Sequence, residues 1–549
     1  MILDFNAASG DYLIRIPRAD GKLLTSMMEE HGLNFSTSAS TSAEAVLWTK
    51  EPYAAVAFYQ HATPAAQQGL LRLQTEIDAS WSKGSGAHIA HPGDCDPWPF
   101  QIAGVEYALR RQNTLIGDQP GLGKTAQAIM FANEIKAKRV LVLCPANIRL
   151  QWAKNIRKWS TMPWPYNVYP ILNGRNGVHP TAAWTITSYD LARSPAIGKA
   201  LAKGLYDLII IDEGHYLKTI DSKRTRAVFG RHDEELMEFE ALASRAGSIM
   251  GLTGTPLPNR PREAYTLARG LCFDSIDFMS EAKFSQRFNP SERKEVVDKT
   301  TGKTKFYIDE RSGRHGELQA RLRVNFMVRR EKHGENGVMG QLNMPEYDIV
   351  QADETTLVKQ ALAAESLLDI DPENLEGADA EVLGHIAIVR HQMGLALADQ
   401  VVEYVQMLLD GGEEKVVLYG HHIDVLEVYC DALAKYGVLR IDGRLSAEKK
   451  QKAVDDFIDC PWMRVIVGNL ISMGTGTDGL QQVCNHCVFG EADWTPGVNQ
   501  QGIDRLDRGG QNNTVQADFI VAPGSFSERI LATALRKNQT IFKALDRII

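Results

Sequence analysis

The chain reads Gly117-Asp118-Gln119-Pro120-Gly121-Leu122-Gly123-Lys124-Thr125 at the point that decides its fold. The run before it, residues 113–116, is typical of a short strand, and apolar residues from 128 to 135 recur on one helical face. A glycine-rich turn between a strand and a helix lets backbone N–H groups surround phosphate oxygens, and the helix N-terminus adds a favourable dipole. The stretch therefore predicts a phosphate-binding loop.

Two side chains of this loop carry the predicted chemistry. Lys124 is placed to reach the β- and γ-phosphates of a nucleotide, and the Thr125 hydroxyl is placed to bind Mg²⁺. Asp118 stands where the general pattern has its first glycine, so a surface turn that contains Gly-Lys-Thr is the alternative. The strand before the loop and the helix after it favour the phosphate site, although such a loop alone indicates only that a nucleotide binds.

A chain of 549 residues is long enough for about three or four domains, each with its own core. Its composition, 44% hydrophobic and 23% charged, is that of a soluble globular protein. The first residues lack the basic flank and apolar core of a signal peptide, and no apolar run approaches the ~20 residues of a membrane span. Seven scattered cysteines indicate no disulfide framework, so a cytoplasmic location is expected.

The net charge of −8 does not exclude nucleic acid, because binding depends on local basic faces rather than on total charge. Each local basic cluster is either a solvated helix face or a phosphate-binding surface, and the charge pattern leaves both open. The clusters are Lys136/Lys138/Arg139, Lys154/Arg157/Lys158, Lys218/Lys223/Arg224/Arg226, Arg329/Arg330/Lys332 and Lys449/Lys450/Lys452.

The pattern of strands and helices predicts an α/β fold with two parallel-sheet lobes. Residues 1–90 resemble a small α+β domain, followed by a Gly- and Pro-rich linker at 84–99. Strands alternate with helices from 91 to 269 (lobe one, the nucleotide-binding lobe) and again from 396 to 549 (lobe two, without a second phosphate loop). Between them, 270–395 is predicted to hold a hairpin about Thr301-Gly302 and helices at 361–368 and 381–409. This organisation places a nucleotide in the cleft between the lobes.

Asp212 and Glu213 end the apolar run 208–211 in lobe one. Carboxylates at the carboxyl end of a buried strand lie at the ligand-binding edge of a parallel sheet. Asp212 is predicted to hold Mg²⁺, and Glu213 to orient or deprotonate the attacking water. The hydroxyls of Leu252-Thr253-Gly254-Thr255-Pro256 follow another strand and are expected to hydrogen-bond this carboxylate motif, the alternative being a plain turn.

Arg505 and Arg508 lie three residues apart in the segment 501–511 of lobe two. Arginines aimed at a γ-phosphate stabilise the charge of the transition state. Without the other motifs, the same spacing would indicate only a surface helix.

The ordered set of motifs resembles helicase superfamily two, specifically the SWI/SNF-type DNA translocases, near the HepA-related (annealing-helicase) branch. The matching residues are Gln101 with Pro99-Phe100, residues 121–125, Cys144-Pro145 with Gln151-Trp152, Ser188-Tyr189, residues 212–215 with Lys218, residues 252–256, Asn259-Arg260-Pro261 with Tyr265, Met327-Val328-Arg329-Arg330, residues 419–422, residues 441–443, Gly474-Thr475-Gly476, residues 489–491 and residues 501–511.

This resemblance implies two RecA-like lobes and an ATP hydrolase that uses Mg²⁺ and is stimulated by DNA. The implied catalytic residues are Lys124, Asp212, Glu213, Arg505 and Arg508. The implied ATP-binding residues are Gln101, Asp118, Gly121, Leu122, Gly123, Lys124, Thr125, Asp212, Gly476, Arg505 and Arg508, with Thr125 and Asp212 toward the metal.

The resemblance also implies movement along double-stranded DNA, with branched or forked DNA as a further substrate to consider, and without separation of the strands. The implied DNA contacts are Arg149, Ser188, Lys218, His422 and Thr475. A strand-separating or RNA-directed helicase and an ATP-gated clamp on DNA or a polymerase are the alternatives. We further expect a monomer of the compact type found in bacteria or phage-infected cells, with residues 1–90 as a separable substrate-targeting unit.

Two positions depart from the family pattern, and a cysteine pair and a histidine pair lie outside the matching motifs. Asp118-Gln119-Pro120 replaces the Asp-Glu-Met usual in the family, and Asp507 stands at the usual histidine position. Cys484 and Cys487 lack a second cysteine pair for zinc, so buried packing thiols are predicted. The His421-His422 pair is interpreted as part of the DNA-facing edge or as satisfied core histidines rather than as a metal site.

Overall fold

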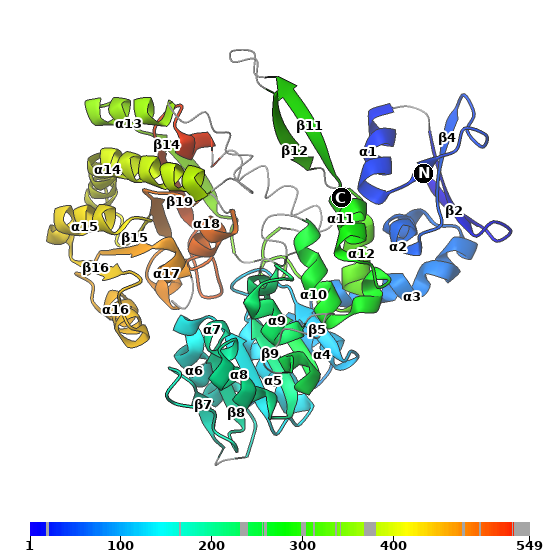
Figure 1. Ribbon diagram of the computed structural model, residues 1–549, viewed down its shortest axis with the longest axis horizontal. Helices are drawn as coiled ribbons and strands as arrows, with labels where there is room; N and C mark the ends of the chain where they lie inside the picture. The colour runs from blue at the N-terminus through cyan, green and yellow to red at the C-terminus, as the bar shows by residue number, and fades with distance from the viewer. Residues whose placement is uncertain are drawn as a thin grey trace.

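The computed structural model describes residues 1–17, 21–163, 166–230, 240–254, 256, 261–297, 304–310, 313–334, 337–340, 342–366, 380–474, 478–493, 496–529 and 531. These residues form two parallel sheets, a small antiparallel sheet near the N-terminus and a long hairpin, which lie in separate parts of the molecule (Figure 1). The predicted fold class is confirmed.

Lobe one is built on a seven-stranded sheet in the order β13-β5-β10-β9-β6-β8-β7, in which all neighbouring strands are parallel. Its strands are β5 Asn113–Ile116, β6 Val140–Cys144, β7 Val168–Pro170, β8 Trp184–Ser188, β9 Tyr206–Asp212, β10 Ala246–Leu252 and β13 Met327–Val328. Near-continuous aliphatic strands suit this position, because a parallel sheet is covered on both faces.

Helices cover both faces of the sheet of lobe one. Ile209 and Ile211 of β9 pack toward one apolar core, whereas Leu208 and Ile210 pack toward the other. The first core is closed by α7 Tyr189–Ala192, α8 Pro195–Ala202, α9 Lys223–Phe229 and α10 Ala264–Leu271, and the second by α4 Pro99–Leu109, α5 Lys124–Glu134 and α6 Arg149–Trp159. The alternation of side chains along a strand thus places α5, which begins at the phosphate loop, on a fully buried face.

Lobe two repeats the architecture with a six-stranded parallel sheet in the order β14-β19-β18-β15-β17-β16. Its strands are β14 Glu346–Gln351, β15 Val416–Gly420, β16 Val438–Ile441, β17 Val465–Asn469, β18 His486–Phe489 and β19 Gln516–Val521. One face carries α13 Thr356–Ser366, α14 Ala380–Asp410 and α15 Ile423–Ala432, and the other α16 Ala447–Asp459, α17 Leu470–Gly474 and α18 Pro496–Ile503. Among the described residues, no helix has both the length and the apolar character that a membrane span requires.

The segment 270–395 is not a unit apart from the lobes. It contains α11 Glu281–Phe288, α12 His315–Asn325 and an antiparallel hairpin of β11 Ser291–Val297 and β12 Thr304–Glu310. The hairpin is confirmed, although its predicted tip at Thr301-Gly302 lies outside the described residues. The expected boundaries miss that β13 extends the sheet of lobe one and β14 that of lobe two, because hydrogen bonding to distant strands leaves no local pattern.

The N-terminal unit has a four-stranded antiparallel sheet in the order β1-β2-β4-β3, packed on helices. Its elements are β1 Ile2–Asn6, β2 Asp11–Pro17, α1 Gly21–His31, β3 Asn34–Phe35, β4 Glu44–Thr49, α2 Pro52–Ala55 and α3 Pro64–Trp81. The unit lies beside α12, as Figure 1 shows. The predicted linker at 84–99 has no strand and holds only the start of α4, but it is anchored, since Asn133 donates a 3.0 Å hydrogen bond to the carbonyl of Ala90.

Buried contacts join the N-terminal unit to α12, and they favour a bracing role over the expected separable unit. Arg321 is 1% exposed and lies 2.7 Å from the carboxylate of Glu51. Arg323, also buried, donates a 3.0 Å hydrogen bond to the Ser80 hydroxyl and stacks 3.4 Å over the ring of Trp81. Buried arginines that find their partners in residues 51–81 make this unit a brace for the core rather than an independent module.

Candidate active site

Two glycines shape the phosphate loop. Gly121 and Gly123 have φ angles of +86° and +70°, a region that L side chains rarely adopt. A Cβ on Gly123 would lie 2.3 Å from Nε2 of Gln101, and a Cβ on Gly121 would lie 2.9 Å from Cβ of Arg508. The loop therefore needs glycine for its backbone and for close contacts with two predicted motifs, one of them from lobe two.

Gln101 holds the loop from the side of α4. It is buried, and its amide donates a 3.2 Å hydrogen bond to the carbonyl of Leu122, while its Oε1 accepts one from the backbone N–H of Trp98. The Leu122 side chain packs in a small apolar cluster with Phe100 and Met339. In this structure both ends of the Gln101 amide are bonded to backbone, so its observed contacts are with the loop and the start of α4.

Lys124 begins α5, and its Nζ donates hydrogen bonds to the carbonyls of Asp118 (2.9 Å) and Gln119 (3.3 Å). Burial lowers the pKa of Lys124, although the negative charges of Glu213 and Asp118 oppose the shift. Thr125 follows in the first helical turn and is half-buried. The ammonium group is thus folded back on the loop, at the helix N-terminus where phosphate oxygens are favoured.

The role predicted for Asp118 as a nucleotide ligand is wrong for this structure. Its carboxylate is fully buried, 2.6 Å from Nη2 of Arg330, and accepts a second hydrogen bond from Nε of that arginine and a third from Gln127. A carboxylate saturated by protein donors has no capacity left for a ligand. Asp118 instead ties the start of the phosphate loop to the segment that leads toward lobe two.

Asp212 ends β9, and three groups converge on it. Its Oδ2 accepts a 2.7 Å hydrogen bond from the indole N–H of Trp152, its Oδ1 accepts one from the backbone of Glu213, and its carbonyl accepts one from the Tyr189 hydroxyl. Burial, with the charge of Glu213, raises the pKa of Asp212 to about 7. A buried carboxylate that resists ionisation would gain from a bound cation, which fits the predicted position of Mg²⁺.

Glu213 is held in the left-handed region with a φ of +52°. Burial alone would raise its pKa, but the hydrogen bond from His215 and the charges of Lys124 and Arg505 lower it. Its Oε2 lies 3.3 Å from Nδ1 of His215, and that same nitrogen lies 3.1 Å from the hydroxyl of Thr253. The strained backbone and the ionised carboxylate suit a group that orients water.

The expected contact between residues 252–256 and the carboxylate motif is confirmed for Thr253, through His215. Thr255 lies outside the described residues.

Arg505 and Arg508 approach this group from lobe two. Arg508 packs against Gly121, and its guanidinium lies 2.7 Å from Asp478 and donates to the carbonyl of Asp504. Burial lowers the pKa of Arg505 to about 10, with the charge of Arg508 acting in the same direction and Glu213 opposing it. Residues of both lobes therefore meet at one loop, whereas predicted Gly476 lies outside the described residues.

A buried ionic cluster joins the inter-lobe segment to the arginine segment. Nζ of Lys332, 1% exposed, lies 2.8 Å from Asp504 and 2.6 Å from Asp507, and Nε2 of His333 lies 2.7 Å from Asp507. We call Lys332, His333, Asp504 and Asp507 the inter-lobe clasp. The sequence analysis did not predict this cluster. The available signal was Asp507, an acidic residue at a position where the family usually has histidine.

The clasp also corrects the interpretation of Arg329, Arg330 and Lys332 as either a solvated face or a phosphate-binding one. All three are at most 3% exposed. Arg329 donates to the carbonyls of Gly117 and Gly254 at the ends of β5 and β10. Because each cation has a buried partner in the protein, this cluster is internal.

The predicted DNA-binding side chains are engaged within the protein. Arg149 donates to the carbonyls of Ala146 and Ile171, and Lys218 lies 2.8 Å from Glu263. Ser188 is 4% exposed, and its hydroxyl caps α7, so a direct contact of that hydroxyl with DNA is contradicted.

His422 and Thr475 belong to lobe two. Nδ1 of His422 lies 2.7 Å from Glu491, and its ring lies against those of His391 and His421, so it is a satisfied histidine. Thr475 lies outside the described residues.

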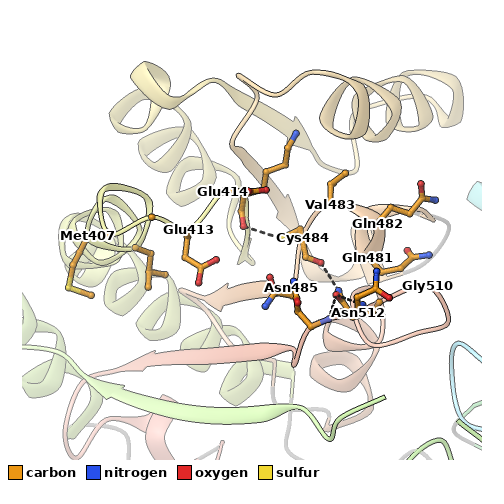
Figure 2. Close-up of a pocket in the computed structure, with 16 residues that line it drawn as sticks. Met407, Glu413, Glu414, Gln481, Gln482, Val483, Cys484, Asn485, Gly510 and Asn512 are labelled. Atoms are coloured by element: carbon orange, nitrogen blue, oxygen red, sulfur yellow. Dashed lines mark hydrogen bonds between the residues drawn. The ribbon is translucent and has the colours of Figure 1, made fainter. Parts of the chain in front are cut away.

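The other cysteine and cavity features of lobe two do not belong to this site. Cys484 and Cys487 are buried members of an apolar core, as predicted. A hollow of about 750 Å³ lies at the amino ends of β15, β18 and β19, lined by residues 411–415, 481–485 and 510–513 among others (Figure 2). Ligands of parallel α/β sheets bind at the opposite, carboxyl edge, where the predicted motifs lie.

Comparison with known proteins identifies this arrangement. The model of the SNF2-related domain matches residues 100–350. Those residues are similar to the SNF2-related domain. The matched residues contain the phosphate loop, Asp212, Glu213 and the inter-lobe segment up to β14, whereas Arg505 and Arg508 lie in lobe two, outside the match.

Two relatives match a longer part of this chain than the SNF2-related domain does. The SWI/SNF-related matrix-associated actin-dependent regulator of chromatin subfamily A-like protein 1 of Xenopus tropicalis is 30% identical over 438 residues, which cover 78% of this chain and 42% of that protein. The DNA annealing helicase and endonuclease ZRANB3 of Mus musculus is 27% identical over 458 residues, which cover 82% and 40%. The chain thus spans less than half the length of these relatives.

Among solved structures, the Sulfolobus solfataricus SWI2/SNF2 ATPase core in complex with dsDNA is 17% identical, with a TM-score of 0.39. It covers 84% of this chain and 100% of that one, a similarity too low to position any residue of the site. The relatives from Xenopus tropicalis and Mus musculus are eukaryotic proteins, and they give no support to the expected bacterial or phage origin.

Proposed function

We propose that this protein is an ATPase that moves along double-stranded DNA without separating its strands. One observation carries the proposal: Lys124, Asp212, Glu213 and Arg505, from two lobes, act on one another electrostatically at a single phosphate loop. A site divided between lobes responds to their relative position, which is how nucleotide turnover becomes movement. The match to the SNF2-related domain supports the same family of activities.

The residues present fit ATP and Mg²⁺. The two glycines leave the loop without side chains where phosphate would approach, and α5 offers its N-terminus. Thr125 and Asp212 would hold Mg²⁺, which when bound neutralises charge on the phosphates. Lys124 would leave its two carbonyl acceptors for phosphate oxygens, and Glu213, kept ionised by its neighbours, would orient the attacking water.

Arg505 and Arg508 would act from lobe two on the charge that develops in the transition state. Asp504 directly precedes Arg505, and Asp507 directly precedes Arg508. Because Lys332 holds both aspartates, the inter-lobe clasp would control the distance of the two arginines from the phosphate loop. Catalysis would therefore depend on lobe closure more than ATP binding does.

The DNA contacts are proposed to come from the loops at the carboxyl ends of the strands in both lobes. With the side chains of Arg149, Lys218 and His422 paired internally, backbone N–H groups in these loops become the principal donors. Such donors suit phosphate oxygens, which carry no sequence information, so binding should be weakly sequence-specific. The names of the two relatives, one of them an annealing helicase, favour DNA over RNA as the partner.

A triplex-displacement assay tests the proposal. ATP should drive displacement of a third strand from duplex DNA, the variant Lys124→Ala should be inactive, and unwinding of a forked duplex should stay near background. Robust unwinding of a plain duplex would indicate a strand-separating helicase, and stimulation by RNA alone an RNA-directed one. Active hydrolysis without displacement would indicate a stationary clamp.

The state and location of the protein are separate proposals. We propose that the protein is a monomer. We also propose that it acts in the cytoplasm, because its seven scattered cysteines indicate no disulfide framework. Sedimentation of the purified protein with and without duplex DNA checks the monomer, and a concentration-dependent increase in mass would contradict it.

A further inference from the structure

Two aromatic side chains reach Asp212 from outside its own strand. Trp152 lies in α6, just after the loop that follows β6, and Tyr189 is the first residue of α7, directly after β8. The strands β9, β6 and β8 are neighbours in the sheet, so the two loops and Asp212 share one carboxyl edge. Asp212 therefore accepts hydrogen bonds from α6 and α7, the helices that follow β6 and β8 at the edge where DNA is proposed to bind.

The two contacts engage different parts of Asp212. The indole N–H of Trp152 donates to the carboxylate Oδ2 over 2.7 Å, whereas the Tyr189 hydroxyl donates to the backbone carbonyl over 2.5 Å. Trp152 and Tyr189 are 2% and 3% exposed, and Tyr189 stacks on Tyr216 with ring centroids 5.7 Å apart and planes 5° apart. A carboxylate held at its oxygen and at its backbone has little freedom that is independent of α6 and α7.

We propose that Trp152 and Tyr189 are positioning residues that couple the segments after β6 and β8 to Asp212, the carboxylate proposed to hold Mg²⁺. The inference rests on the proposed function, since the loops must meet DNA for the coupling to be used. Neither aromatic ring needs to touch DNA, because each begins or lies near the start of a helix that follows such a loop. A shift of α6 or α7 on DNA binding moves a donor that is directly bonded to Asp212.

The same lobe supplies matched controls. Trp184 is fully buried at the start of β8, and its indole N–H lies 3.1 Å from the sulfur of Met162. Tyr206 is 5% exposed at the start of β9, and its hydroxyl donates to the carbonyl of Leu201 over 3.1 Å. Replacing these residues removes the same atoms from an equally buried place at the amino edge of the sheet, away from Asp212.

The experiment compares Trp152→Phe and Tyr189→Phe with Trp184→Phe and Tyr206→Phe in the full chain. ATP hydrolysis is measured with and without saturating duplex DNA, and binding of a fluorescent ATP analogue is titrated with Mg²⁺ in the absence of turnover. Thermal unfolding of all four variants reports the shared cost of lost packing. The loss should be about tenfold or more for Trp152, whose indole donates to a carboxylate, and about several-fold for Tyr189, whose hydroxyl donates to a neutral carbonyl.

The expected result is that Trp152→Phe lowers the ratio of DNA-stimulated to basal hydrolysis by about tenfold and Tyr189→Phe lowers it about several-fold. Both variants should raise the Mg²⁺ concentration for half-maximal analogue binding. The controls should keep both quantities within about twofold of the parent. The double variant should lose less than the product of the single losses, because both residues act on one carboxylate.

Three results would overturn the inference. They are unchanged stimulation in both test variants, an equal fall in basal and stimulated rates, and losses in the controls that match those in the test variants. If the parent itself shows no DNA stimulation, the proposed function fails, and the Mg²⁺ titration still decides whether Trp152 and Tyr189 position Asp212.

Discussion

The inter-lobe clasp gives the sharpest prediction, for the variant Lys332→Met. Nζ of Lys332 neutralises the carboxylates of Asp504 and Asp507 at 2.8 and 2.6 Å, and the three side chains are 1% to 3% exposed. Methionine keeps the length of the side chain, so little cavity is created. Removal of one partner from a buried ion pair costs about 3–5 kcal/mol, because the remaining charge stays buried without compensation. Asp504 then loses its cation while Asp507 keeps His333 at 2.7 Å, so we expect a loss within that range.

A matched control is Lys452→Met. Lys452 lies 3.6 Å from Asp456, and the two side chains are 75% and 41% exposed. An exposed pair of this kind is worth about 0–1 kcal/mol, so the control isolates the effect of burial. The double variant Lys332→Met/Asp507→Asn should recover part of the loss, since it removes one of the stranded charges.

The assay is urea unfolding, combined with hydrogen exchange of the peptide that contains residues 503–508 and with steady-state ATP hydrolysis. Lys332→Met should lower the unfolding midpoint, increase exchange around Arg505 and Arg508, and lower kcat by at least about tenfold while ATP binding changes little. If Lys332→Met behaves like Lys452→Met in stability and in exchange, the clasp does not position the arginines and the reasoning is wrong.

Four further predictions concern the site and the N-terminal brace. Glu213→Gln should lower kcat by about 10²–10⁴-fold and leave binding of an ATP analogue intact, and normal hydrolysis would exclude Glu213 as the group that orients water. Arg505→Ala should lower kcat and kcat/KM together, on the order of 10³-fold, whereas a raised KM with unchanged kcat would contradict a role in the transition state. The pKa of Asp212 is raised from 3.8 to about 7, so the folded protein holds its proton more tightly and loses stability as pH rises across that window. Asp212→Asn should therefore unfold at a higher temperature than the parent above pH 7 and at a similar one near pH 4, and an equal difference at both would refute the buried-charge argument. Deletion of residues 1–90 should remove Glu51 from Arg321 and Ser80 from Arg323, both of which are buried, and give an insoluble or inactive fragment, whereas a soluble, active fragment would show that the unit is separable.

Several parts of the fold and site could be predicted from local sequence because their signals are local. The strand predicted at 113–116 coincides with β5, and the apolar run 208–211 lies within β9 Tyr206–Asp212. The phosphate loop needs a strand, positive-φ glycines and a helix in direct succession, so its conformation follows from residues 113–135 alone. The position of Asp212 and Glu213 follows equally, since a carboxylate after a buried strand must lie at the carboxyl edge of the sheet.

Charge partners, by contrast, were decided only by tertiary structure. Arg330 meets Asp118 across 212 positions of sequence, and Lys332 meets Asp507 across 175, so no periodicity connects them. An isolated arginine or lysine has the same sequence signature whether it faces water, phosphate or a buried carboxylate, which is why the cluster 329–332 was read as a possible surface and Asp118 as a ligand.

The distance in sequence between interacting groups also explains which other features could be predicted. Sequence by itself determined which backbone could form a phosphate loop, which strands were buried and where catalytic carboxylates had to lie, because each depends on neighbouring residues. Tertiary structure decided that Trp152 and Tyr189 hold Asp212 and that residues 51–81 complete the charges of α12. Burial of a charged or polar group is tolerated only when a partner is present, and for these groups the partner lies on another element of the fold.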